Sequence, residues 1–250
     1  MKTPRAVADL AAAFQFLTRI PVPRFTHDGE TLQRSAKFFP VVGLAVGVAA
    51  AGVFSCLNAH LPIAAASLFT VLFTTLLTGA LHEDGLADCA DAFGGGWSRD
   101  QVLAILKDSR IGSYGALALI FSVLGRSVLL AGLSRSEALQ YIVSAHVLCR
   151  GTVLPLCFLP PAARTGASQG GRLAGRVSAT SAGIGMIAAV AAAGYLLRTA
   201  AIVPILAVSA VTALSGAYCR RRIGGMTGDC FGATIQLAEM AVYTAGVWHR

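Results

Sequence analysis

Seven long apolar stretches constrain this chain more than any other feature of its sequence. Each holds roughly 19–22 residues, close to the ~20 that an α-helix needs to cross the ~30 Å hydrocarbon core of a bilayer. A transmembrane β-barrel would instead show segments of about 10 residues with alternating polarity, and we find none. The stretches are Phe38–Ala59, Ile63–Leu81, Gly112–Leu133, Ala138–Leu159, Ala179–Leu197, Ala200–Tyr218 and Cys230–Trp248. We therefore predict an all-α, polytopic transmembrane helical bundle of about seven spans, forming a single integral membrane domain over residues 1–250.

The composition excludes the main alternatives to a membrane protein. Apolar residues make up 55% of the chain and charged residues only 13%, whereas a soluble domain carries about 25% charged residues. Intrinsic disorder requires low hydrophobicity, so it is excluded as well. The six cysteines form no CxxC pair and no zinc-like spacing with histidine, and we interpret them as ordinary buried thiols.

The distribution of basic residues predicts an orientation. With a cytoplasmic N-terminus, fifteen of the 20 Lys and Arg residues fall in the cytoplasmic segments 1–37, 82–111, 160–178 and 219–229. The opposite side receives only Arg135, Arg198 and Arg250. This asymmetry follows the positive-inside rule. Orientation and anionic lipid headgroups therefore account for the net charge of +8, and no nucleic-acid partner is predicted.

The N-terminal segment does not read as a signal peptide. Residues 1–20 include Asp9, Gln15 and Arg19, so they contain no charge-free apolar core before a cleavage site. We predict a helix over Ala6–Thr18 at the cytoplasmic interface, ended by the two prolines of the segment 20–23.

Acidic residues are concentrated in one predicted loop. Six of the 12 lie between Glu83 and Asp108. On a helix, Asp84, Asp88 and Asp91 occupy positions i, i+4 and i+7, within roughly 60° of one another. Three like charges on one face repel and call for a cation, and oxygen ligands favour Mg²⁺ or Mn²⁺ over zinc. The alternative is a solvated loop whose acids meet nearby arginines.

Two further groups are predicted on the same face of the membrane. Lys107, Asp108 and Arg110 offer a carboxylate and two cations, which suits phosphate binding, although the cations also fit simple positive-inside anchors. Asp229 follows the Gly-rich segment 224–228. That segment could close over a ligand, or Asp229 could cap the last helix.

Two arginines lie inside predicted spans. An intramembrane cation is costly, so Arg126 and Arg150 are expected to face a polar cavity or an acidic partner, and Glu239 is a candidate partner for one of them. We expect Arg150 to face a substrate cavity. Acids, cations and a divalent ion together suit phosphoryl or phosphodiester transfer. The sequence contains no P-loop, no HExxH and no GxSxG motif.

Five segments resemble the adenosylcobinamide-GDP ribazoletransferase (cobalamin synthase) family. They are FLTRIPVP at 16–23, FPVVG at 39–43, HEDGLADCAD at 82–91, KDSRIGSYG at 107–115 and GMTGDCFGA at 225–233. The resemblance thus extends over nearly the whole chain. The aspartate segment is also similar to that of CDP-alcohol phosphotransferases, but Asp88-Cys89 stands where that pattern has Ala-Arg.

The resemblance implies a Mg²⁺-dependent transferase in the bacterial inner membrane, with its active site on the cytoplasmic face. It would join adenosylcobinamide-GDP to α-ribazole or its 5′-phosphate and release GMP. Association with other cobalamin-pathway enzymes is a further hypothesis, without a motif behind it. The implied metal ligands are Asp84, Asp88 and Asp91, with Glu83 as a supporting or alternative ligand. The implied catalytic residues are Asp108, as fourth ligand or base, Lys107, Arg110 and Arg150 on phosphate, and Asp229.

Two other functions stay open at this point. A CDP-alcohol phosphotransferase of lipid synthesis would share the metal chemistry but use another acceptor. A membrane transporter would fit the apolar spans and the intramembrane arginines. It fits less well with an acid cluster at the membrane face and with the lack of a clear inverted repeat.

Overall fold

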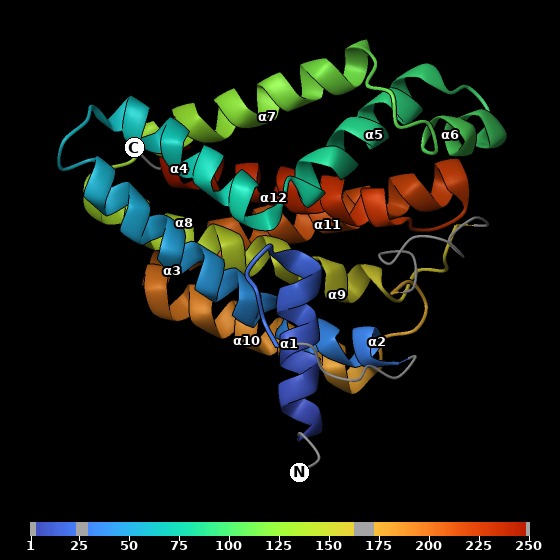
Figure 1. Cartoon of the computed structure of the whole chain (residues 1–250), viewed down its shortest axis with the longest axis horizontal. Helices are drawn as coiled ribbons and strands as arrows, with labels where there is room; N and C mark the ends of the chain where they lie inside the picture. Colours follow the sequence, from blue (N-terminus) through green and yellow to red (C-terminus); the bar gives the residue numbers. More distant parts are fainter. Residues whose placement is uncertain (1–3, 24–29, 163–172, 249–250) are drawn as a thin grey trace.

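A computed structural model describes residues 4–23, 30–162 and 173–248 of the chain. Within these ranges the structure is all-α, as predicted, and its only β pairing is an isolated bridge between Pro161 and Met226. Figure 1 shows the long helices packed side by side, with the shorter α1 near the N-terminus crossing them at a steep angle.

Each predicted apolar stretch corresponds to a helix. The long helices are α3 (Phe39–Leu57), α4 (Ile63–Thr78), α7 (Ser113–Ala131), α8 (Arg135–Gly151), α10 (Ala179–Leu197), α11 (Ile202–Ile223) and α12 (Gly228–Trp248). The shorter elements are α1 (Arg5–Leu17), α2 (Thr31–Ser35), η1 (Ala36–Phe38), α5 (Leu81–Gly95), α6 (Arg99–Ile105), α9 (Val153–Leu156) and η3 (Arg198–Ala201). The stretch predicted over Ala138–Leu159 is divided between α8 and α9, which meet at Thr152.

Fewer of these helices qualify as membrane spans than the seven predicted. Among the described residues, three stretches are long and apolar enough: Thr31–Leu57, Ser113–Ala131 and Ala179–Ile223. A fourth is reached only if α4 and α5, which meet at 93°, count as one broken span. We treat the three as the membrane-spanning segments. Phe121, Ile187 and Leu214, one in each of α7, α10 and α11, are at least 70% exposed, which suits contact with lipid.

Helices α8 and α12 form the polar centre of the bundle. α8 has only 17 residues, and its side chains are buried without interruption from Tyr141 to Gly151. α12 packs against α5, α7, α8 and α11 and buries Gln236 and Glu239. Polar side chains in these two helices therefore face protein rather than lipid, as expected for polar groups at membrane depth.

The N-terminal helix is tied to the bundle by charge. It spans Arg5–Leu17, close to the predicted range, and its buried Asp9 pairs with Arg34 and Lys37, each at 3.2 Å. The chain then reaches the corner between α4 and α5, where the Arg19 N–H donates to the Leu77 carbonyl at 2.8 Å. Gly79 and Ala80 adopt positive φ at that corner, and the turn sends α5 across the bundle.

Candidate active site

The predicted aspartate helix exists. α5 begins at Leu81, directly after the corner, and carries Asp84, Asp88 and Asp91 in one continuous helix. The i, i+4, i+7 spacing therefore places the three carboxylates along one face, as the sequence predicted. Asp84 is exposed, whereas Asp88 and Asp91 are half-buried.

A close crossing of two helices adds a fourth aspartate. A Cβ at Gly85 would lie 2.8 Å from the Asp229 carbonyl oxygen and 3.0 Å from its Cα. One turn further along α12, a Cβ at Gly232 would lie 3.3 Å from the His82 Cα. The backbones of α5 and α12 can approach this closely only because both positions are glycine. The crossing brings Asp229 next to the aspartates of α5.

Asp229 does not cap α12. The helix begins at Gly228, and the preceding residue Thr227 accepts a hydrogen bond from the Cys230 N–H at 3.2 Å through its Oγ1. Thr227 thus fills the capping role that the sequence left open for Asp229, whose carboxylate lies in the first turn of the helix. The preceding Gly-rich segment is bound to the chain after α9, where the Met226 N–H donates to the Pro160 carbonyl at 2.9 Å.

The charges of the aspartates act on one another. Burial raises the pKa of Asp88 to about 6, helped by the charges of Asp84, Asp229 and Asp91. Burial likewise raises the pKa of Asp229 to about 6, and Asp84 adds to the rise. In the described part of the chain, no Lys or Arg lies within 4.0 Å of Asp84, Asp88 or Asp229. The cluster therefore concentrates negative charge that no described Lys or Arg neutralises by direct pairing.

Asp91 also joins the cluster to α7. Its two carboxylate oxygens accept hydrogen bonds from the Gly112 N–H at 2.7 Å and the Gly115 N–H at 2.8 Å. A Cβ at Gly112 would lie 2.5 Å from the Asp91 Oδ1, so glycine is needed there for the contact. The carboxylate thus accepts hydrogen bonds from N–H groups at the start of α7 that have no partner within the helix. Its negative charge also interacts favourably with the positive end of the helix dipole.

Lys107, Asp108 and Arg110 lie on the connection between α6 and α7, just before the glycines that bind Asp91. Lys107 and Arg110 are exposed. Arg110 pairs with Asp108 at 2.6 Å, and this pairing lowers the pKa of Asp108 to about 2. A carboxylate with so low a pKa is a weak base near neutral pH. Among the described contacts, these three residues form none with the aspartates of α5.

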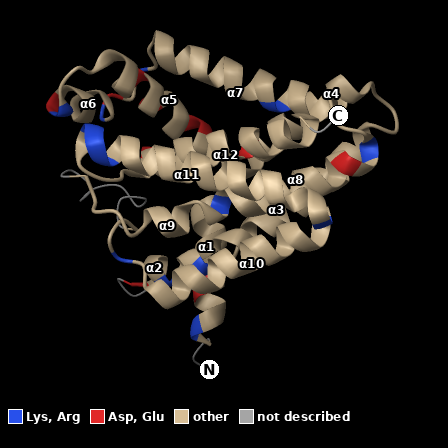
Figure 2. Ribbon diagram, turned by 180° about the vertical axis from the view of Figure 1, so that it is seen from behind, with Lys and Arg blue, Asp and Glu red and all other residues tan. Residues whose placement is uncertain are grey.

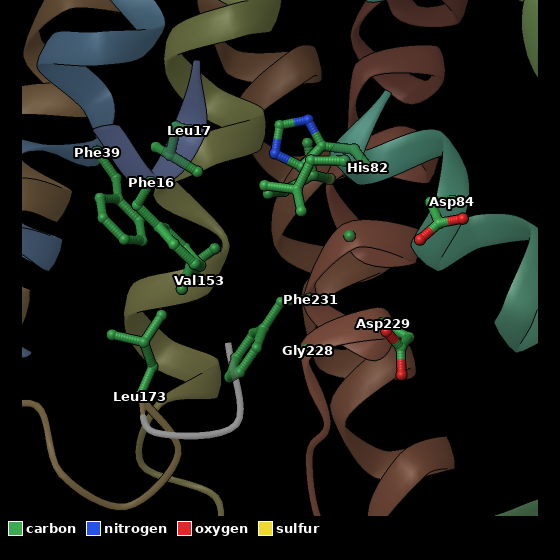
Figure 3. A pocket seen from close by; sticks show the side chains of 13 residues that line it. Phe16, Leu17, Phe39, His82, Asp84, Val153, Leu173, Gly228, Asp229 and Phe231 are labelled. Carbon is green, nitrogen blue, oxygen red and sulfur yellow. The ribbon is translucent and has the colours of Figure 1, made fainter. Parts of the chain in front are cut away.

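A cavity of about 320 Å³ opens beside Asp84 and Asp229. Its other walls are mostly apolar, as Figure 3 shows. They come from segments far apart in the sequence: Phe16, Leu17, Phe39, Leu81, His82, Val153, Leu173, Gly228, Phe231, Gly232 and Ile235. Sequence analysis did not predict that α1 contributes to the site. The only available signal was that Phe16 and Leu17 belong to a segment that resembles the family.

His82 is the one imidazole among the described residues that line this cavity. Its side chain is buried, and its Nε2 has no hydrogen-bond partner in the described structure. Burial, reinforced by the charge of Arg150, lowers the pKa of His82 to about 3. The ring is therefore neutral at physiological pH, with one N–H donor and one acceptor nitrogen.

Glu83 and Arg150 belong to a separate buried cluster. Arg126 on α7 donates to Glu83 at 3.0 Å and to Glu239 at 3.4 Å, which confirms that Glu239 partners an intramembrane arginine. Glu83 also accepts a hydrogen bond from Thr75 at 2.9 Å. Its carboxylate thus contacts the interior rather than the other aspartates. The ion pair between Arg126 and Glu83 escaped sequence analysis, because helical periodicity does not show which buried charges meet across helices.

Arg150 is fully buried in the last turn of α8. Its guanidinium contacts the His146 Nδ1 at 3.1 Å and the Cys149 Sγ at 3.5 Å, and it does not line the cavity. His146, Cys149 and Glu239 are the only three metal-ligand side chains among the described residues whose ligand atoms lie within 4.8 Å of one another. The adjacent Arg150 charge opposes a cation there.

The spacing of the aspartates suits a magnesium ion that keeps water and substrate oxygens among its ligands. Among the described residues, no three carboxylates of this cluster have ligand oxygens that all lie within 4.8 Å of one another. Mg²⁺ usually keeps several waters and takes only one or two protein carboxylates, together with substrate phosphates. Acidic oxygen donors around an open cavity therefore match its requirements, whereas zinc would favour Cys or His ligands.

Comparison with known proteins identifies the family. Residues 9–247 match the profile of the cobalamin-5-phosphate synthase family. The chain belongs to this family. Similar proteins include one from Azorhizobium caulinodans, 44% identical with 96% of each chain covered, and one from Mesorhizobium japonicum, 39% identical with 96% of this chain and 93% of the relative covered. Both carry the name adenosylcobinamide-GDP ribazoletransferase. No solved structure matches the chain.

The five segments that resembled the family converge on one region. Four of them supply walls of the cavity: 16–23 through Phe16, 39–43 through Phe39, 82–91 through His82 and Asp84, and 225–233 through Asp229 and Phe231. The fifth, 107–115, meets Asp91 through the N–H groups of its glycines. The segments that resemble the family thus line the cavity or contact the aspartate helix.

The crossing of α5 and α12 gives a first prediction. Gly85→Ala is expected to destabilise the folded protein by about 1–3 kcal/mol, because the added methyl group meets the Asp229 backbone rather than a movable side chain. Thermal unfolding of the detergent-solubilised protein measures the effect. Gly52→Ala is the matched control, since a Cβ there meets nothing within 4 Å. Equal unfolding temperatures for the two variants would contradict the close crossing.

Proposed function

We propose that this protein is an adenosylcobinamide-GDP ribazoletransferase that acts at the cytoplasmic face of the bacterial inner membrane. The donor would be adenosylcobinamide-GDP, the acceptor α-ribazole or its 5′-phosphate, and GMP the leaving group. The observation that carries the proposal is the convergence of four of the family segments on a cavity lined by Asp84 and Asp229, which belong to a cluster of four aspartates whose charges act on one another. The relatives that cover nearly the whole chain bear the name of this activity.

Asp84 and Asp88 are proposed as the main protein ligands of a Mg²⁺ ion, for which Mn²⁺ could substitute. Asp229 lies close enough to share in binding, and Asp91 retains lone pairs besides those used by the α7 N–H groups. When bound, the ion would withdraw negative charge from the diphosphate of the donor. Glu83 is assigned to the Arg126 cluster and supports α5 from its buried side.

The reaction transfers the corrinoid-bearing phosphoryl group. The 5′-hydroxyl oxygen of the ribazole forms a bond to the β-phosphorus, the one attached to cobinamide. The bond from this phosphorus to the bridging oxygen breaks, and GMP leaves with that oxygen. Asp229 is our candidate for the group that takes the hydroxyl proton, because it lines the cavity beside Asp84. Asp108 is less suited, because Arg110 already holds its carboxylate.

Cations near the rim would hold the phosphates. Lys107 and Arg110 are exposed on the connection that leads into the Asp91 contacts, and we propose that they bind donor phosphate oxygens. Arg150 is buried three residues before Val153, which lines the cavity. We propose that its charge acts on the site through the electrostatic field rather than by direct contact.

The basic ends of the helices support the proposed orientation. Arg220, Arg221 and Arg222 occupy the last turn of α11. Figure 2 shows basic residues at the end of this helix that lies near α6. Arg222 donates to the Gly96 carbonyl at 2.7 Å, and Arg99 donates to the Ile223 carbonyl at 3.0 Å. The basic end of the spanning segment is therefore joined to the connection that follows α5, which supports a position of the aspartates on the side that the positive-inside rule makes cytoplasmic.

The direct test is an assay of the purified protein in detergent with Mg²⁺, adenosylcobinamide-GDP and α-ribazole. GMP and the joined corrinoid nucleotide should appear in equal amounts. Product formation from CDP-diacylglycerol instead would favour a lipid CDP-alcohol phosphotransferase. Solute flux into vesicles without turnover would favour a transporter. Either of these results would overturn the proposal.

Removal of the divalent ion gives a second prediction. After treatment with EDTA, GMP release should fall to background, because the clustered carboxylates would then repel the diphosphate rather than bind it. Added Mg²⁺ or Mn²⁺ should restore activity, and Ca²⁺ should restore less, since it favours longer bonds and more ligands. Full activity in EDTA would rule out the metal assignment.

A further inference from the structure

The cavity beside the aspartates has two chemically different ends. Asp84 and Asp229 stand at one end, and Phe16, Phe39 and Phe231 contribute to the apolar remainder, as Figure 3 shows. A ligand that fills it must therefore combine a polar end, directed at the acids, with a compact apolar end. A nucleoside with an unusually apolar base has this construction.

Size and polarity select among the parts of the proposed substrates. At about 320 Å³ the cavity is at the small end of ligand pockets, which excludes a corrin macrocycle. Guanine would fit by size, but its edge carries several hydrogen-bond donors and acceptors. Apart from the two aspartates, His82 is the only polar side chain among the described residues of the wall. Guanine buried there would leave polar groups without partners, at a cost of about 1–3 kcal/mol each.

The base of α-ribazole matches these walls. It is a dimethylated benzimidazole, a flat bicyclic ring whose one nitrogen free of the ribose is its only polar atom. His82 is buried, and its Nε2 lacks a hydrogen-bond partner. An unpaired nitrogen inside the protein is unfavourable. Nε2 has almost no accessible surface in this conformation, but a rotation of the His82 ring toward the cavity that this residue lines would let a ligand nitrogen relieve that cost.

We infer that this cavity is the subsite for the base of the acceptor nucleoside, with His82 Nε2 donating a hydrogen bond to the unsubstituted ring nitrogen. The inference rests on the proposed function. The ribose then extends toward Asp84 and Asp229, which brings its 5′-hydroxyl to the aspartate cluster. His82 is thus a specificity-determining residue, and the phenylalanines exclude more polar bases.

The test combines a change in the protein with a change in the ligand. Binding of α-ribazole is compared with that of an analogue in which an indole carbon replaces the free ring nitrogen, by equilibrium dialysis against the purified protein. The wild-type protein should bind α-ribazole about 10-fold more tightly than the analogue, as one hydrogen bond predicts. His82→Leu should bind both ligands equally. A preference that survives in His82→Leu would overturn the role of His82.

A second variant tests the cavity itself. Val153→Phe adds volume to a buried wall residue and should raise the KM for α-ribazole at least 10-fold, while the KM for adenosylcobinamide-GDP stays within twofold. Val128→Phe, at a position 67% exposed on α7, is the matched control and should change neither KM. A selective rise in the KM for the corrinoid substrate would overturn the assignment of the subsite.

The two proposals fail in distinguishable ways. If the wild-type protein releases no GMP from adenosylcobinamide-GDP and α-ribazole, the proposed function is wrong. If it does release GMP but Val153→Phe leaves α-ribazole binding unchanged while remaining folded, only the subsite is wrong. Thermal unfolding of Val153→Phe and His82→Leu shows whether each variant is folded. If either unfolds, Phe39→Trp, which narrows the same cavity from another helix, is expected to give the same selective rise.

Discussion

Asp88→Asn is expected to reduce GMP release by about 100-fold or more. Loss of a residue that merely supports a metal ligand already costs 10–100-fold, so loss of a proposed ligand should cost at least as much. The same change should leave the protein folded or slightly more stable, because Asp88 is partly buried among Asp84, Asp91 and Asp229 and their charges repel it. Loss of activity without loss of stability is the signature of a residue that serves the site rather than the fold.

Initial rates of GMP release and thermal unfolding in detergent measure the two effects separately. Asp100→Asn is the matched control, since Asp100 is an exposed acid in the first turn of α6 and has no proposed role. Turnover near the wild-type rate in Asp88→Asn would refute its assignment as a ligand. A large fall in unfolding temperature would instead assign Asp88 to the fold.

Arg126→Met is expected to destabilise the protein by about 3–5 kcal/mol. Arg126 is 1% exposed and pairs with both Glu83 and Glu239. Removing it leaves two carboxylates buried without their cation, which is far more costly than the modest net gain from forming the pair. Because the three residues lie on α7, α5 and α12, the variant should loosen the helices that carry the aspartates.

Thermal unfolding and the yield of folded protein after solubilisation measure the loss. The combination of Arg126→Met with Glu83→Gln and Glu239→Gln should recover most of it, because no buried charge is then left unpaired. Arg135→Met is the control, since Arg135 is exposed and its hydrogen bonds within the described residues go to Ser55. A single Arg126→Met variant as stable as the control would show that the cluster does not hold the helices together.

Much of the fold was predictable from local patterns. Apolar runs near 20 residues long predicted where helices lie, and the i, i+4, i+7 spacing predicted that one helix carries Asp84, Asp88 and Asp91. The number of membrane spans was less predictable. α8 and α12 resemble spans in sequence, but their polar residues pack against protein at the centre of the bundle.

The candidate site was predictable only in part. The spacing of the aspartates in the sequence predicted that they share one face of α5. The high free-energy cost of an unpaired charge inside the membrane predicted that Glu239 would pair with an arginine. The place of Phe16 in the cavity wall and the partnership of Glu83 with Arg126 depend on how distant helices pack. Such contacts are set by three-dimensional complementarity, which helical periodicity within one segment does not encode.

Helices from both ends of the chain form the cavity, and this arrangement affects when the cavity can form during synthesis. Its wall includes Phe16 from the first helix and Phe231 from the last. Because the ribosome makes the chain from its N-terminus, the pocket is completed only when α12 has emerged and docked onto α5. An unfinished chain in the translocation machinery therefore lacks the complete cavity, and the proposed nucleoside site forms only at the end of synthesis.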